Sequence, residues 1–246
     1  MTDPFFAKLE HLFYLNDIAE YATKEIAEKL HAMLLRLQEV NSYMNLTAIR
    51  DEDGILVKHI ADSLKIAKYI PKNAKILDVG CGGGFPSLPL AIARPDISVT
   101  SLDSTEKKVK YVGETAKLLG ISSQTALYGR AEELAHDPAL RESFDIVTAR
   151  AVASLPVLCE LCLPFVKIGG AFVAMKSGDV EEELAASAAG IKKLGAAPFT
   201  VHAFSLVSHE NGITPEARTV LIANKLSPSP AAYPRAYAKI KKNPLK

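Results

Sequence analysis

The stretch that decides the fold is Ile76-Leu77-Asp78-Val79-Gly80-Cys81-Gly82-Gly83-Gly84-Phe85-Pro86. A short apolar run, typical of a buried strand, ends in a series of small residues, and Phe85-Pro86 can begin a helix because proline suits the first helical turn. Glycine lets the backbone bend sharply and approach a ligand without a Cβ in the way. The stretch therefore predicts a strand, a tight turn and a helix, with a nucleoside-like ligand at the carboxyl end of the strand.

The sequence around this turn alternates between short β-branched runs and helix-length segments, which is typical of a parallel sheet covered by helices. Up to residue 70, apolar residues recur at spacings of three and four, which predicts an N-terminal helical cap. We therefore predict an α/β fold with a doubly wound, mostly parallel seven-stranded sheet that ends in a hairpin turning at Asn211-Gly212. The predicted strands are 76–79, 97–102, 125–128, 144–148, 170–176, 198–206 and 218–225. The predicted divisions are a cap at 1–70, a Rossmann-like domain at 71–226 and a basic tail at 227–246.

The composition is that of an ordinary globular chain, with 246 residues, 48% of them hydrophobic, and a net charge of +1. No apolar run approaches the roughly 20 residues that span a bilayer, and the acidic start of the chain differs from a signal peptide, so we expect a cytoplasmic protein. Cys159 and Cys162 form a CxxC pair, but no nearby segment offers two further zinc ligands. We therefore expect these cysteines to be buried in the core and expect no metal site.

The C-terminal end is strongly basic, although the chain as a whole is nearly neutral. From Lys225 to Lys246 there are six basic residues and no acidic one. Such a proline-punctuated basic tail favours contact with nucleic acid phosphates, and a merely solvated tail is the alternative. Arg235 is the tail residue that we expect at the substrate.

The glycine spacing separates two classes of cofactor. A dinucleotide fingerprint reads G-x-G-x-x-G, whereas the glycines here stand at 80, 82, 83 and 84, which favours S-adenosylmethionine. Asp103 follows the second predicted strand, where a carboxylate can accept hydrogen bonds from both ribose hydroxyls; its alternative role is to cap the next helix. Asp78 is expected to meet the ammonium group of the methionine moiety. Residues 129–133 can meet the adenine or simply begin a surface helix.

With these residues the chain resembles the small-subunit ribosomal RNA methyltransferase G family, guanine-N7 enzymes also called glucose-inhibited division protein B. The likeness extends over nearly the whole chain. It rests on Asn45-Leu46-Thr47, Lys58-His59-Ile60-Ala61-Asp62-Ser63, Asp78 to Pro86, Leu102-Asp103-Ser104, Arg130-Ala131-Glu132-Glu133, Ala149-Arg150-Ala151-Val152-Ala153-Ser154, Lys176-Ser177-Gly178, Tyr233-Pro234-Arg235 and Lys242-Asn243-Pro244-Leu245. Ser87 stands where the family more often has glycine, outside the expected cofactor contacts.

The resemblance implies a class I S-adenosylmethionine-dependent methyltransferase domain at 71–226 and methyl transfer to N7 of a guanine in 16S ribosomal RNA. The partner would be small-subunit ribosomal RNA or an assembling small subunit, and the enzyme would act as a monomer. The predicted cofactor contacts are Asp78, Gly80, Gly82, Gly84, Phe85, Asp103, Ser104, Thr105, Ala131, Glu132 and Arg150. The predicted substrate contacts are Arg130, Arg150, Lys176 and Arg235. A methyltransferase for small molecules or proteins and a non-catalytic nucleotide-binding protein are the alternatives.

Guanine N7 carries an in-plane lone pair and no proton, so its methylation requires positioning and no general base. The Asp/Asn-Pro-Pro-Tyr/Phe motif of many exocyclic-amine methyltransferases is absent, and Thr148-Ala149-Arg150-Ala151 stands at the equivalent strand end. Arg150 can hold the guanine edge, a phosphate or the cofactor, or it can pair with Glu132 or Glu133.

Three further polar residues have two interpretations each. Lys176 can meet a phosphate or be an ordinary surface lysine. His59 and Asp62 lie at helical spacing but are too few to bind a metal. We expect these two residues to cap a helix or to join the helical region to the sheet.

Overall fold

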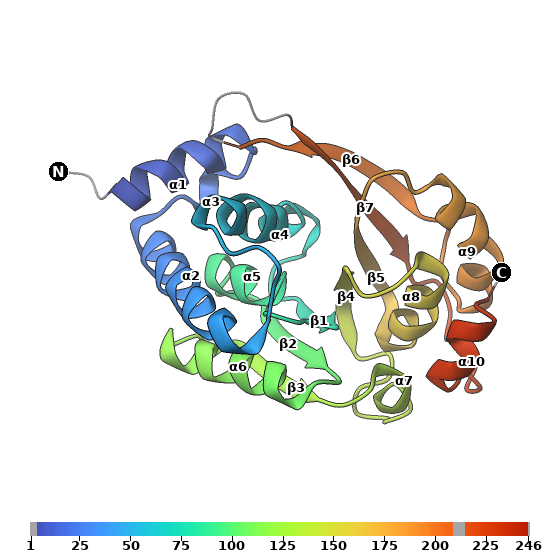
Figure 1. The fold of residues 1–246 in the computed structure, drawn as a ribbon. Helices are drawn as coiled ribbons and strands as arrows, with labels where there is room; N and C mark the ends of the chain where they lie inside the picture. Colours follow the sequence, from blue (N-terminus) through green and yellow to red (C-terminus); the bar gives the residue numbers. More distant parts are fainter. Residues whose placement is uncertain (1–3, 209–214, 246) are drawn as a thin grey trace.

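A computed structural model describes residues 4–208 and 215–245 of the chain. The strands are β1 (Lys75–Val79), β2 (Ser98–Asp103), β3 (Gln124–Tyr128), β4 (Phe144–Arg150), β5 (Val166–Ser177), β6 (Thr200–Leu206) and β7 (Glu216–Asn224). They form one sheet in the order β3-β2-β1-β4-β5-β7-β6 (Figure 1). The five strands β1 to β5 pair with one another in parallel, whereas β7 is antiparallel to both of its neighbours, β5 and β6. The predicted mostly parallel, seven-stranded α/β fold is confirmed.

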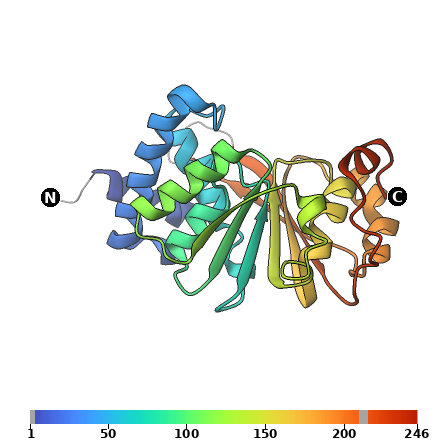
Figure 2. The ribbon, with the colours of Figure 1, turned by 90° about the horizontal axis from the view of Figure 1, so that it is seen from below.

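Helices cover both faces of the sheet, with the N-terminal and C-terminal helices on opposite sides (Figure 2). One face is covered by α5 (Ser87–Ala93), α6 (Glu106–Leu118) and the N-terminal helices. The other is covered by α7 (Ala131–Leu134), α8 (Leu155–Cys162), α9 (Glu181–Lys193) and α10 (Tyr237–Lys242). The N-terminal helices are α1 (Pro4–Leu15), α2 (Lys24–Met44), α3 (Glu52–Ile55) and α4 (Asp62–Leu64), with a π-helical segment, Leu56–Ala61, between the last two.

The N-terminal helices share one hydrophobic core with the sheet. Leu30 and Leu34 of α2 belong to the same buried cluster as Ile76 of β1 and Leu88 of α5, and none of the four is exposed. Burying each such side chain contributes about 2 kcal/mol. The loops that connect these helices are therefore held in a fixed position over the sheet.

The tail after β7 is packed against the protein along its described length. Ile240 of α10 is fully buried in the core beneath α8 and α9. Arg235 donates hydrogen bonds to the carboxylate of Glu160 on α8, which is itself fully buried. The lysines Lys239 and Lys241 of α10 stay exposed.

Several local predictions have a clear outcome. Cys159 and Cys162 are unpaired and fully buried in α8, as predicted for the two cysteines. α5 begins at Ser87, later than the predicted helix start. The predicted hairpin turn at Asn211-Gly212 lies outside the described residues. No helix within the described ranges is long and apolar enough to cross a membrane.

Strand register gathers polar side chains on one face of the sheet. Asp78 of β1 is paired in register with Ser101 of β2 and with Thr148 of β4, so these three side chains project to the same face. Asp103 and Arg150 lie two residues further along β2 and β4. Because side chains alternate along a strand, both project from this same face at the carboxyl edge of the sheet.

Candidate functional site

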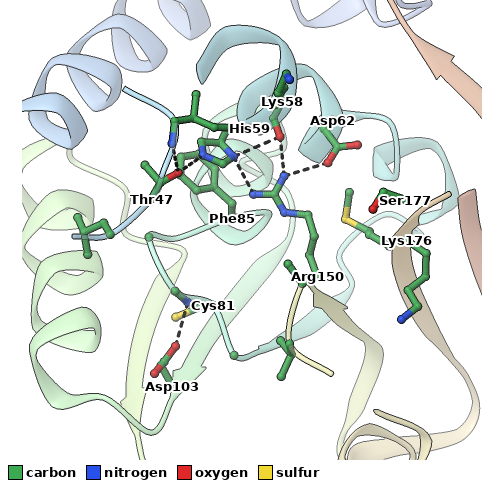
Figure 3. A pocket seen from close by; sticks show the side chains of 18 of the residues that line it. Thr47, Lys58, His59, Asp62, Cys81, Phe85, Asp103, Arg150, Lys176 and Ser177 are labelled. Carbon is green, nitrogen blue, oxygen red and sulfur yellow. Dashed lines mark hydrogen bonds and ion pairs between the residues drawn. The ribbon is translucent and has the colours of Figure 1, made fainter. Parts of the chain in front are cut away.

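A cavity of about 730 Å³ opens at the carboxyl ends of β1, β2, β4 and β5, beside the N-terminal helices (Figure 3). This volume is in the range of sites for small molecules and cofactors. One half, which we call the turn half, comprises Gly80 to Gly83, Phe85 and Asp103 to Thr105. The other half, which we call the cap half, comprises Leu46, Thr47, Lys58, His59, Asp62, Arg150, Lys176 and Arg218.

The turn half presents bare backbone to the cavity. Gly80 and Gly82 have φ angles of +74° and +55°, which favour glycine. The backbone N–H groups of Gly80 and Cys81 donate to the carbonyl oxygen of Leu102 at 2.8 and 3.0 Å, which ties the turn to the end of β2. A Cβ added at Gly82 would find no atom closer than 3.9 Å. The space beside Gly82 is therefore open to a ligand, and only the positive φ favours glycine there.

Asp103, predicted at the ribose, ends β2 and lines the cavity. Its Oδ2 accepts a hydrogen bond from the N–H of Gly82 at 3.0 Å, and its Oδ1 accepts one from the N–H of Thr105 at 2.8 Å. Thr105, and not Asp103, is the residue at the N-cap position of α6. Each carboxylate oxygen can accept a further hydrogen bond, so Asp103 can brace the turn and still receive ribose hydroxyls.

Four residues predicted to contact the cofactor lie outside the cavity lining: Asp78 and Gly84 near the turn, and Ala131 and Glu132 after β3. Asp78 is fully buried, and burial raises the pKa of its carboxyl to about 7, opposed by the neighbouring Ser87 and by the charge of Arg150. The Asp78 side chain projects to the same face of the sheet as those of Asp103 and Arg150, the face covered by α5, two residues before the carboxyl edge. At Gly84, φ is +87° and an added Cβ would lie 2.5 Å from Leu88 Cδ1. Gly84 therefore allows the turn and α5 to pack closely, and the cofactor contacts at both positions stay predictions.

Arg150 extends from the end of β4 to the N-terminal helices (Figure 3). Its Nη1 donates to the carbonyl oxygen of Lys58 and to Asp62 Oδ2, both at 2.9 Å. Its Nη2 lies 3.2 Å from Nδ1 of His59. The side chains of Arg150 and Asp62 are only 14% and 7% exposed, so this ion pair is nearly buried. The predicted contact between the helical region and the sheet is confirmed, and the alternative pairing with the glutamates after β3 is wrong.

His59 is fixed on three sides. Its ring stacks on Phe85 with centroids 4.5 Å apart, and its Nε2 lies 2.7 Å from Thr47 Oγ1. The side-chain amide of Asn41 in turn exchanges two hydrogen bonds of 2.9 Å with the backbone of Thr47. Burial, together with the nearby charge of Arg150, lowers the pKa of His59 to about 3. The imidazole is therefore neutral at physiological pH.

A second set of ion pairs joins the cap to the edge of the sheet. Nε of Arg218 lies 3.7 Å from Asp62 Oδ1, and its Nη2 lies 2.7 Å from Glu216 Oε2. The other oxygen of Glu216 lies 2.6 Å from Lys58 Nζ. Burial raises the pKa of Asp62, and the charges of Arg150 and Arg218 oppose this shift. Two arginines from different strands thus meet one carboxylate of the cap.

Lys176 lines the cavity at the end of β5. Its Nζ lies 2.6 Å from Glu183 Oε2 and donates to the carbonyl oxygen of Ala153 at 3.2 Å. The side chain is only 15% exposed, so the surface-lysine interpretation is wrong. The same oxygen of Glu183 accepts the N–H of Leu155, which ties the loop after β4 to α9.

The predicted site residues after β3 lie beside the cavity and do not belong to its lining. Arg130 precedes α7 and donates from Nε to Glu132 Oε1 at 2.5 Å, while its guanidinium lies 5.3 Å from the ring centroid of Tyr237. The N–H of Gly129 donates to the carbonyl oxygen of Asp103 at 3.1 Å. This segment, which includes Ala131, therefore adjoins the turn half.

Arg235, predicted at the substrate, pairs with a buried glutamate. Its Nε and Nη2 lie 2.8 and 2.6 Å from the two carboxylate oxygens of Glu160. Glu160 is fully buried, and a buried carboxylate requires a cationic partner. Arg235 therefore anchors the tail, and its contact with the substrate stays a prediction.

Sequence reasoning missed part of the cap half. Thr47, Lys58, His59 and Asp62 stand in segments that carry the family resemblance, which was an available signal for them. No such signal existed for Arg218, because its partner Asp62 belongs to a distant segment of the chain.

Comparison with known proteins places this geometry in a family. The chain matches the protein family described as rRNA small subunit methyltransferase G (GidB) over residues 26–211. The chain belongs to this family. A family member named ribosomal RNA small subunit methyltransferase G from Clostridium beijerinckii is 41% identical over 232 residues, which cover 94% of this chain and 95% of that protein. The protein of the same name from Deinococcus radiodurans is 43% identical over 210 residues, covering 85% and 81% of the two chains.

Solved structures share the fold of this GidB family member at low sequence identity. A SAM-dependent O-methyltransferase from Thermotoga maritima superposes with a TM-score of 0.51 at 16% identity, covering 79% of this chain and 72% of that one. TYW2 of M. jannaschii, solved in complex with AdoMet, has a TM-score of 0.50 at 14% identity and covers 72% and 78%. These likenesses confirm the Rossmann-like class I methyltransferase fold. The cyclase SpnF also shares it, with a TM-score of 0.52 at 18% identity over 69% and 82%, so the fold alone does not fix the reaction.

Proposed function

We propose that this family member transfers the methyl group of S-adenosylmethionine to N7 of a guanine in small-subunit (16S) ribosomal RNA. The observation that carries the proposal is a single cavity that joins a bare-backbone turn, a carboxylate at the end of β2 and a fixed arginine at the end of β4. The names of the related proteins supply the substrate class.

The turn half fits S-adenosylmethionine. Backbone without side chains at Gly80 and Gly82 admits the methionine moiety closely, and Asp103 keeps acceptor capacity for the ribose hydroxyls. The ring of Phe85 adds an apolar wall, and the segment that holds Glu132 adjoins the position expected for the adenine. The proposed cofactor contacts are Gly80, Gly82, Phe85, Asp103, Ser104, Thr105, Ala131, Glu132 and Arg150.

Positioning, without a general base, is sufficient for the reaction. When bound, S-adenosylmethionine supplies a methyl carbon whose bond to sulfur breaks as its bond to N7 forms. A guanidinium has five N–H donors, and Arg150 uses three of them on the cap, which leaves two for the cavity. We assign one of these to guanine O6, because the usual bidentate contact to O6 and N7 would occupy the lone pair that has to react. His59 cannot act as a base, because its pKa lies near 3.

The C-terminal tail supports RNA as the partner. At the start of the tail, Nζ of Lys225 donates a hydrogen bond to Ser229 Oγ. Further along the tail, the ring of Tyr237 lies under the guanidinium of Arg130, beside the cavity. The α10 lysines Lys239, Lys241 and Lys242 are exposed and form no ion pair with another described residue. We propose that these lysines, with Arg130 and Lys176, contact RNA phosphates, and that the protein acts as a cytoplasmic monomer.

The test is methyl transfer from labelled S-adenosylmethionine to RNA from cells that lack the corresponding enzyme. Naked 16S ribosomal RNA and isolated small subunits are offered in parallel reactions. We expect the label to appear in 16S ribosomal RNA. Chemical mapping should then place the methyl group on N7 of one guanine. Label on an exocyclic amine, on protein or on a small molecule would contradict the proposal.

A further inference from the structure

We infer that His59 is a positioning residue for Arg150 and that it acts in the neutral tautomer that carries its proton on Nε2. This inference rests on the proposed function in one respect: it takes Arg150 to be the group that meets the acceptor base. His59 connects that arginine to the loop after α2, because its two ring nitrogens face Arg150 and Thr47 (Figure 3).

The partners on the two nitrogens determine the tautomer. A guanidinium only donates hydrogen bonds, so Nδ1, 3.2 Å from Nη2 of Arg150, has to be the accepting nitrogen. The proton of the neutral ring is then on Nε2 and is donated to Thr47 Oγ1 at 2.7 Å. In the other tautomer, Nδ1–H would donate to the carbonyl oxygen of Lys58 at 3.2 Å and would face the N–H groups of Arg150. In that tautomer Nη2 of Arg150 would have no acceptor at Nδ1, so the contact with the guanidinium favours the proton on Nε2.

The surroundings hold the ring in this orientation. Phe85 stacks on its face at an interplanar angle of 20°, and the guanidinium of Arg150 lies 5.4 Å from the centroid of the same Phe85 ring. Thr47 Oγ1 also accepts the N–H of Ile49 at 3.1 Å, which fixes the hydroxyl that His59 contacts. Burial and the positive charge of Arg150 keep the imidazole neutral.

The consequence is a guanidinium whose plane is fixed. With Asp62 and the Lys58 carbonyl on Nη1 and His59 on Nη2, Arg150 is held from both ends of its fork. Without the acceptor on Nη2, the planar guanidinium can tilt about the Cδ–Nε bond, and its two remaining N–H groups lose their direction into the cavity. A position error of this kind lowers the rate of a reaction that depends on alignment.

The kinetic experiment compares two substitutions of His59 in the full-length enzyme. His59→Leu keeps an apolar group against Phe85 but removes the acceptor, and we expect kcat/KM for RNA to fall about 10- to 100-fold, mainly through kcat. His59→Asn keeps an acceptor near the position of Nδ1, and we expect it to restore most of this loss. His31→Leu is the matched control, because His31 also stacks on a phenylalanine, Phe5, with centroids 4.0 Å apart, but lies outside the cavity lining. Equal losses in both His59 variants, or no loss in either, would overturn the inference.

The second measurement does not require activity. In protein labelled with ¹⁵N at its six histidines, the nitrogen shifts of His59 report which ring nitrogen carries the proton, and the spectrum of His59→Asn assigns the signals. We expect an unprotonated Nδ1 and a protonated Nε2 at neutral pH. A protonated Nδ1 would overturn the inference even in an active enzyme. Failure of the wild-type enzyme to methylate guanine N7 would instead refute the proposed function and leave the tautomer result standing.

Discussion

The two halves of the cavity are built from different material. The turn half is shaped by backbone: two glycines with positive φ angles and amide groups tied to the end of β2. The cap half is shaped by charged side chains from α4, β4 and β7, with Asp62 between Arg150 and Arg218. A continuous run of sequence encodes the first half, whereas distant segments have to meet to form the second.

This difference separates two tasks. A cofactor that is the same in every turnover can be held by a rigid backbone shape, which is largely formed before it binds. An acceptor base has to be placed against the reacting carbon within a fraction of an ångström, which requires directed donors such as Arg150. We therefore expect damage to the turn half to reduce cofactor affinity, and damage to the cap half to reduce stability and turnover.

The largest effect is expected at Arg150. Arg150→Met leaves Asp62 buried, with Arg218 as its remaining cationic partner at 3.7 Å, and should lower the free energy of unfolding by about 3 to 5 kcal/mol. Urea denaturation measures this loss. The double variant Arg150→Met with Asp62→Asn is the control, and it should be more stable than the single variant because no charge is stranded. A single variant as stable as the wild type would show that the cap half is not held by this ion pair.

A large effect that depends on pH is expected beneath the turn half. Asp78 is fully buried, and its pKa is raised from 3.8 to about 7, so the folded protein disfavours the ionised carboxylate. Stability should therefore decrease as pH rises from about 4 to about 7 and level off above that, by about 4 kcal/mol relative to Asp78→Asn. Thermal unfolding of both proteins across this range measures the difference. Parallel stability curves would show that Asp78 does not carry this shift.

A moderate effect distinguishes the bare backbone of the turn from an ordinary glycine turn. Gly80→Ala places a Cβ 2.5 Å from Val152 Cγ2 at a φ of +74°, whereas Gly120→Ala has a φ of +64° and no atom within 4 Å. We expect Gly120→Ala to cost about 1 to 2 kcal/mol of backbone strain, and Gly80→Ala about 1 to 3 kcal/mol more. Only Gly80→Ala should also weaken S-adenosylmethionine binding, measured by calorimetry. Equal cofactor affinity in the two variants would remove Gly80 from the cofactor site.

The smallest effect is expected outside both halves. Replacing Lys239, Lys241 and Lys242 by alanine should weaken RNA binding about tenfold and flatten its dependence on salt, because fewer counterions are released. The matched control replaces three exposed lysines of the N-terminal region, Lys24, Lys68 and Lys72. Filter binding over a range of salt concentrations measures both slopes. The same reduction in the control would mean that α10 is no specific RNA contact.

The turn half could be predicted almost entirely from the sequence. The glycine run follows an apolar strand directly, and Asp103 ends the next strand, so a local pattern places both at one edge of a parallel sheet. What the sequence leaves open there is the direction of the side chains. Sequence shows that Asp78 and Gly84 flank the turn, but the face toward which each projects depends on how α5 packs against β1.

The cap half could not be derived in the same way. The bond between Arg150 and Asp62 joins residues 88 positions apart, and local periodicity says nothing about such a pair. Arg130 and Arg235 illustrate a similar limit, because the sequence predicts each basic residue near the site as a substrate contact but does not show that a glutamate is its partner in the fold. β5 begins at Val166 and continues through Gly170, which the sequence predicts as its start.

The most direct test of the account is the affinity of S-adenosylmethionine for the wild type and for Asp103→Asn, measured by calorimetry. The substitution keeps one acceptor oxygen to brace Gly82 or Thr105 but removes the charge offered to the ribose. We predict binding weaker by about 1 to 3 kcal/mol, or roughly 10- to 100-fold. Unchanged affinity in a folded Asp103→Asn protein would contradict the assignment of the turn half to this cofactor.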